Sequence, residues 1–220
     1  MDLIFGAPGQ SLKDWRQDLE TALRFEIDHL STYGLTYERG TPLWKRRERG
    51  EVQSLPEETE REMYAKAIDM LSSVGFEQYE ISSFARPGRR CLHNQVYWAN
   101  EAYFGFGMGA ARYVERRREL NTRDLVTYIQ RVERGDSPTF QSERLDDEER
   151  ARETMAIQLR RVEGINRQRF QEQTEWSLDD VAGDAIARQV RQGFLFDDGE
   201  RVALTHEGKF VADAVIEELL

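Results

Sequence analysis

The sequence has 220 residues, of which 39% are hydrophobic and 33% charged, and its formal net charge is −10 at pH 7. This length suits one large domain or two small ones, and the acidity argues against generic nucleic-acid binding, which needs a basic face. No apolar run approaches the roughly 18–20 residues that span a bilayer, no secretory signal opens the chain, and one cysteine excludes an internal disulfide framework. We therefore expect a cytoplasmic protein without a transmembrane segment.

The first forty residues predict a strand, a helix and a second strand. Residues 2–5 and 29–36 are the expected strands, and Ser11 with Asp14 is a typical start for the intervening helix. Such a unit implies a right-handed parallel crossover. Because two parallel strands do not form a stable sheet alone, we expect the chain to be part of a larger fold. Apolar residues share one face of the helix: Leu12, Trp15, Leu19, Ala22 and Leu23.

The next segment predicts a helix from Pro56 to about Ser73, a stop at Gly75 and a strand over 76–84. The buried stripe of this helix is expected to contain Met63, Ala67, Met70, Leu71 and Val74. Further on, glycines alternate with bulky residues at Gly105, Phe106, Gly107, Met108 and Gly109. This spacing is not a dinucleotide fingerprint, and it indicates close approach of the backbone to a neighbour or ligand.

After about residue 120 the sequence becomes helical and highly charged. Helices are expected over 124–134, from Asp146 through Leu159, over roughly 166–173 and 178–192, and from Thr205 to Leu219. Before the last helix, the turn Asp197-Asp198-Gly199 predicts a β-hairpin. Helices followed by a hairpin resemble a winged helix. We expect two domains, residues 1–115 and 116–220, in an α/β plus α+β fold.

The hexapeptide from His93 to Trp98, HNQVYW, is the strongest candidate for a binding site. His93 supplies a nitrogen for iron, Asn94 can select which ring nitrogen is free, and Tyr97 and Trp98 offer aromatic faces with polar tips. These residues together suit a flat, apolar, metal-containing ring. The residues alone leave open the alternative of a packed, hydrogen-bonded histidine in the core.

Three blocks of the sequence resemble the coproporphyrinogen-oxidase-like radical-SAM proteins, and specifically their HemW-type haem chaperone branch. The first is DLIFGAPGQ at 2–10, and the second is HLSTYGLTYE at 29–38 followed by GTP at 40–42. The third runs from GFEQYEIS at 75–82 through ARPG and HNQVYW to GFGMGA at 105–110. They occur in the family's order and spacing.

The resemblance implies the last two β/α units of a partial (β/α)6 radical-SAM barrel with a strand-containing extension, followed by a small helical, winged-helix-like domain. It also implies haem ligation by His93, S-adenosylmethionine contacts by Asp2 and Thr36, and a four-iron cluster on three cysteines. Cys91 is the single cysteine, so this chain alone cannot hold the cluster. We therefore expect a haem-trafficking protein, or the C-terminal piece of one, whose partners are haem and a haem-accepting protein.

Two other functions remain open at this point. One is a coproporphyrinogen III oxidase-like radical enzyme completed by a separate N-terminal half. The family often continues its glycine block as Gly-x-Gly-Ala-His-Ser. In the corresponding residues 107–112 of this chain, Ala111 replaces the His and Arg112 replaces the Ser, which weakens the case for catalysis. The other is a winged-helix module that binds a protein. His29 is expected to be structural and His206 exposed. We also expect self-association through the strand edge that a missing barrel half would leave open.

Overall fold

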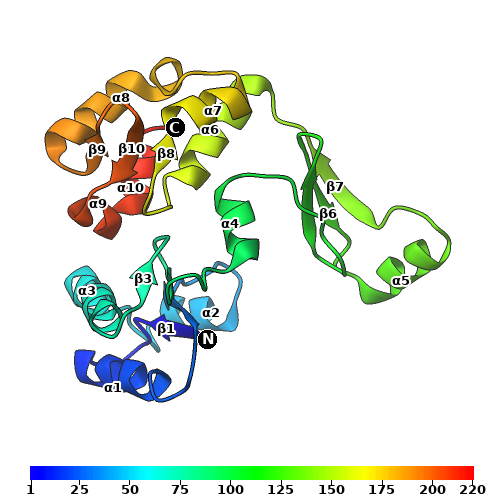
Figure 1. Ribbon diagram of the computed structural model, residues 1–220. Helices are drawn as coiled ribbons and strands as arrows, with labels where there is room; N and C mark the ends of the chain where they lie inside the picture. Colours follow the sequence, from blue (N-terminus) through cyan, green and yellow to red (C-terminus); the bar gives the residue numbers. More distant parts are fainter. The chain divides into compact units, whose positions relative to one another are not determined.

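The computed structural model describes all 220 residues (Figure 1). They form two compact units, Met1–Cys91 and Leu92–Leu220. The boundary expected at 115/116 falls instead within the turn between two paired strands of the second unit. The segment HNQVYW therefore belongs to the C-terminal unit, where it forms a helix. No helix in either unit is long and apolar enough to cross a membrane.

The N-terminal unit contains a four-stranded sheet in the order β1-β2-β4-β3. The strand β1 (Asp2–Phe5) pairs in parallel with β2 (His29–Gly34), as the crossover predicts. On its other side β2 pairs antiparallel with β4 (Ser83–Ala85), which in turn pairs with β3 (Glu77–Gln78). The single strand expected over 76–84 is wrong, because the chain turns between β3 and β4, where the Tyr79 N–H donates to the Ser83 carbonyl.

Three helices complete this unit: α1 (Leu12–Ala22), α2 (Pro42–Glu48) and α3 (Glu57–Ser73). The expected start of α1 is confirmed, since Ser11 and Asp14 form a reciprocal capping box. Trp15 is fully buried and donates its indole N–H to the Met63 carbonyl at 2.8 Å, which fixes α1 against α3. Val74 is 44% exposed, contrary to expectation, because α3 ends one residue earlier and the backbone leaves the buried stripe.

The C-terminal unit begins with α4 (Leu92–Trp98) and a three-stranded antiparallel sheet. Its strands are β5 (Ala111–Val114), β6 (Arg117–Asn121) and β7 (Thr139–Glu143), with α5 (Leu125–Glu133) between the last two. The sequence did not predict this sheet. Gly105 confirms the expected close approach, because a Cβ there would lie 2.6 Å from the carbonyl carbon of Ala111.

The remaining helices pack around a second sheet in the order β8-β10-β9. They include three long helices: α6 (Asp147–Gln158), α7 (Arg167–Thr174) and α8 (Leu178–Gln192). The strands are short: β8 (Ile165–Asn166), β9 (Leu195–Asp197) and β10 (Arg201–Leu204). The predicted hairpin is thus confirmed. The final helix is interrupted at Val211, and it forms α9 (His206–Phe210) and α10 (Ala212–Glu217).

Candidate functional site

The helix α4 presents His93 to solvent, while Asn94, Tyr97 and Trp98 are half-buried. One helical turn separates His93 from Tyr97, and their rings meet edge to face, with centroids 4.6 Å apart and planes at 84°. No hydrogen bond in the structure involves the His93 imidazole. The histidine therefore lies at the surface with its ring nitrogens accessible and its orientation set by an aromatic neighbour.

A row of tyrosines continues from this helix into the sheet. The Tyr97 ring lies 4.3 Å from that of Tyr103, and Tyr103 lies 6.4 Å from Tyr113. Tyr103 and Tyr113 also exchange two backbone hydrogen bonds of 2.8 and 2.9 Å. Burial raises the pKa of Tyr103, although the nearby Arg118 acts in the opposite direction. Sequence reasoning missed these two tyrosines, which flank the glycine block, because their pairing depends on a sheet that it did not predict.

Arg118 connects the same sheet to α6. Its guanidinium makes a bidentate pair with Glu153, with hydrogen bonds of 2.6 and 2.7 Å. This hydrogen bonding raises the pKa of Arg118 despite its partial burial. A two-point contact between a guanidinium and a carboxylate fixes orientation as well as distance, so β6 and the Tyr113 ring beside it hold a defined place against α6.

The end of α4 is held by side-chain amides from α6 and α7. The carbonyl of Ala99 accepts from Gln158 at 2.9 Å and from Gln173 at 3.0 Å. Gln173 also donates to the carbonyl of Asn100 at 3.1 Å. Asn100 adopts a left-handed conformation, with φ 53°, as is common just after a helix. These bonds satisfy carbonyls that a helix end leaves open, and they anchor the helix that carries His93.

Trp98 faces the helical part of the unit. Its ring lies below the guanidinium of Arg160, 5.6 Å from the ring centroid. Its indole N–H is buried and has no hydrogen-bond partner. A buried donor without a partner costs stability, so the position of the Trp98 indole depends on its packing and not on a hydrogen bond.

The residues predicted to contact S-adenosylmethionine are both exposed and lie at different ends of neighbouring strands. Asp2 begins β1 and is paired with Ser31, whereas Thr36 lies two residues beyond the end of β2. Thr36 lies five residues after Ser31, the partner of Asp2, and five residues of extended chain span about 16 Å. The structure does not bring these two side chains together, and their role stays a prediction from the resemblance.

The other candidate ligands do not form a metal site. His29 accepts or donates a hydrogen bond of 2.7 Å with the Tyr79 hydroxyl, which is a structural contact as expected. His206 is exposed, also as expected, and meets Phe210 edge to face. Cys91 is half-buried and free. No group of three or more His, Cys, Asp or Glu side chains converges in the structure, so these residues do not fit an iron–sulfur cluster.

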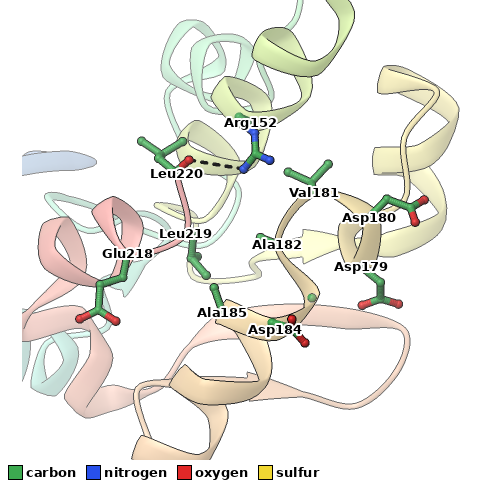
Figure 2. A pocket seen from close by; sticks show the side chains of 11 residues that line it. Arg152, Asp179, Asp180, Val181, Ala182, Asp184, Ala185, Glu218, Leu219 and Leu220 are labelled. Atoms are coloured by element: carbon green, nitrogen blue, oxygen red, sulfur yellow. Dashed lines mark hydrogen bonds between the residues drawn. The ribbon is translucent and has the colours of Figure 1, made fainter.

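A separate cavity of about 670 Å³ opens where α8 is kinked at Ala182 (Figure 2). Asp179, Asp180 and Asp184 line it together with Arg152, whose guanidinium donates to the Leu220 carbonyl at 3.4 Å. Figure 2 shows the aspartates fanned out on different sides of the helix instead of meeting at one point. This cavity contains none of the residues predicted from the sequence.

Known proteins align with this sequence over nearly the whole chain, and a family model matches part of it. Residues 145–211 match the family described as "HemN C-terminal domain". The chain is 34% identical over 215 residues to "Heme chaperone HemW" of Bacillus subtilis (strain 168), covering 98% of this chain and 57% of that protein. It is 30% identical to the protein of the same name from Lactococcus lactis subsp. lactis (strain IL1403), covering 100% of this chain and 58% of that protein.

The fold also matches a solved structure. Coproporphyrinogen III oxidase (HemN) from Escherichia coli, described as a radical SAM enzyme, superimposes with a TM-score of 0.77 at 16% identity. The match covers 99% of this chain and 54% of that one. The chain thus spans little more than half the length of the relatives it matches. It is a relative of the HemW-type haem chaperones and of HemN-like radical-SAM proteins, and it corresponds to their C-terminal portion.

Proposed function

We propose that this chain binds haem as the C-terminal portion of a HemW-type chaperone, with His93 as the iron ligand. The observation that carries the proposal is the accessible imidazole of His93 on a helix whose end is anchored. Iron in haem takes a neutral imidazole nitrogen as an axial ligand. A ligand on an anchored helix binds with little loss of conformational freedom.

The neighbouring aromatic side chains provide the apolar surface that a porphyrin requires. Tyr97 is already ordered by contacts with His93 and Tyr103, so its ring can pack against haem at a small entropic cost. Trp98, which is half-buried with its ring under Arg160, can add aromatic surface beside Tyr97. Asn94, next to His93 in sequence, can orient the imidazole or contact the porphyrin edge. Each of these three residues contributes less than the bond to iron.

The remaining features of the proposal rest on resemblance. The parallel pair β1–β2 would be the last two strands of a partial (β/α)6 barrel, and Asp2 and Thr36 would contact S-adenosylmethionine in it. The four-iron cluster needs cysteines that this chain does not have. The partner that would receive the haem is a haem-accepting protein. We do not assign catalysis to this chain.

A haem titration of the complete chain tests this proposal. Binding shifts and sharpens the Soret absorption band, and His93→Ala is expected to abolish most of that shift. Tyr97→Ala and Trp98→Ala should weaken binding less, because they remove packing surface and leave the iron ligand in place. A His93→Ala protein with the affinity and spectrum of the wild type would refute the assignment. If His93 were structural instead, its replacement would lower the melting temperature and leave haem binding unchanged.

A further inference from the structure

The hairpin β5–β6 has two different faces. Its register pairs Arg112 with Glu119 and Val114 with Arg117. Successive residues of a strand point to opposite sides, so these four share one face, and Tyr113 lies on the other with the tyrosine row of the candidate haem site. The first face is therefore separate from the proposed haem site.

A cavity of about 460 Å³ opens on this first face. Besides Val114 it is lined by one aromatic ring, three arginines and two glutamates: Phe104, Arg112, Arg117, Arg144, Glu115 and Glu119. The volume lies within the range of roughly 300–1,000 Å³ in which proteins bind small molecules.

Phe104 is held at the cavity by the backbone on both of its sides. On one side, the Tyr103 backbone is hydrogen-bonded to the Tyr113 backbone in β5. On the other side, the Gly105 backbone lies so close to the Ala111 carbonyl that a larger residue does not fit. The Phe104 side chain nevertheless is 67% exposed. Several large apolar side chains of this protein are exposed, and Phe104 is the one that lies at the wall of this cavity. An aromatic ring in that place is a surface on which a planar ligand can stack.

The charges of the cavity are only partly neutralised within the protein. Arg112 is paired with Glu119. Arg117 and Arg144 are exposed, and their side chains make no ion pair or hydrogen bond in the structure; Glu115 is the remaining acidic group. Three arginines against two glutamates leave this face positive, although the chain carries a net charge of −10. Guanidinium groups bind phosphates and carboxylates with two parallel hydrogen bonds.

We propose that this cavity binds a small planar aromatic anion, of about the size of a mononucleotide. Its ring would stack on Phe104, and its phosphate or carboxylate would bind Arg117 and Arg144. Arg112, which is paired with Glu119, lines the same cavity. This site is independent of haem ligation by His93, and it can be present or absent whatever the outcome of the haem titration.

Binding is best measured by isothermal titration calorimetry on the full chain with four separate probes. AMP represents an aromatic phosphate and 2-naphthoate an aromatic carboxylate, while adenosine and inorganic phosphate represent the ring and the anion alone. We expect at least one aromatic anion to bind more tightly than adenosine or phosphate. Binding of AMP alone would identify a phosphate ligand, and binding of 2-naphthoate alone a carboxylate ligand.

Variants then locate the site. Arg117→Ala and Arg144→Ala are each expected to raise the dissociation constant about tenfold, because each removes one charge-assisted contact. Phe104→Ala should raise it by a similar factor, because it removes the stacking contact. Arg123→Ala is the matched control, because Arg123 is an exposed, unpaired arginine of the same unit that does not line the cavity. The proposal is overturned if neither aromatic anion binds, or if the cavity variants bind as tightly as the control.

Discussion

The side chain of Asn100 donates a hydrogen bond of 2.9 Å to the hydroxyl of Thr154, and both residues are buried. The same hydroxyl donates to the Arg150 carbonyl one turn earlier in α6. This contact joins the end of the His93 helix directly to the helical core. The bond to Thr154 is the hydrogen bond that the Asn100 side chain makes in the structure, so its amide depends on Thr154.

Replacing Thr154 with Val is therefore expected to lower the free energy of unfolding by about 1–3 kcal/mol, the cost of leaving a buried donor without a partner. Urea denaturation measures this change. Thr21→Val is the matched control, since the Thr21 hydroxyl also donates to a carbonyl one turn earlier but is exposed. Equal effects of the two substitutions would show that the bond to Asn100 contributes nothing.

Gly105→Ala is expected to disrupt the packing of residues 103–105 against β5. The new Cβ would overlap the Ala111 carbonyl, and relief requires a shift of the backbone. Overpacking of this kind costs about 1–3 kcal/mol, which thermal unfolding can detect. The control is Gly183→Ala in α8, where the nearest atom to a Cβ is 3.4 Å away on a side chain. The control should be neutral or slightly stabilising, because alanine favours helices.

Local signals in the sequence predicted much of the N-terminal unit and of the last helices. Ser11 with Asp14 marked the start of α1, and Asp197-Asp198-Gly199 marked the hairpin β9–β10. The sheet β5–β7 could not be predicted in the same way. Its central strand β6 has charged residues at three successive positions, 117–119, and the pairing of Arg112 with Glu119 becomes apparent only once the register is known.

The candidate site was predictable in its motif and not in its surroundings. The four motif residues lie within one short helix, so their proximity follows from local sequence. The groups that support this helix come from far along the chain, with Gln158 and Gln173 lying 59 and 74 residues beyond Ala99. No periodic pattern in the sequence indicates such contacts, because each depends on how whole helices pack.

The N-terminal unit is expected to lose stability on mild acidification through His29. Burial lowers the pKa of His29, and the N-terminal ammonium adds to this effect. The unfolded chain therefore takes up a proton first, near the ordinary histidine pKa of about 6.5. The contribution of His29 is complete above that pH and declines as the pH falls below it.

Urea midpoints at pH 8 and pH 5.5 measure this dependence. His29→Gln, which can still hydrogen-bond to Tyr79, removes the titrating group and should give a smaller difference between the two pH values than the wild type. A wild type and a variant with the same pH dependence would show that His29 titrates alike in the folded and unfolded states.

The strand β1 forms one edge of its sheet, and Ile4 on this strand is 57% exposed. An apolar edge strand with unpaired backbone groups favours association with another chain. We predict concentration-dependent self-association, which Ile4→Lys should reduce. Light scattering after size-exclusion chromatography measures it. Phe25→Lys is the control, because Phe25 is 58% exposed outside any strand, and a wild type that stays monomeric at all concentrations would contradict the prediction.

The central claim, that His93 binds haem iron, has a close internal control. His206 is also exposed and also meets an aromatic ring four residues later, with centroids 5.2 Å apart and planes at 85°. In its helix α9 the neighbouring ring is Phe210, and the tyrosine row described at α4 consists of Tyr97, Tyr103 and Tyr113. If His93 acts through its place in the structure, His206→Ala should leave haem binding unchanged.

The most direct test is chemical rescue of the missing ligand. Haem is added to His93→Gly in the presence and absence of free imidazole, and the Soret spectrum is compared with those of the wild type and of His206→Gly. The account predicts that His93→Gly loses the wild-type spectrum and that imidazole restores it, because the small ligand occupies the vacated position on iron. A wild-type spectrum for His93→Gly without imidazole would contradict the account.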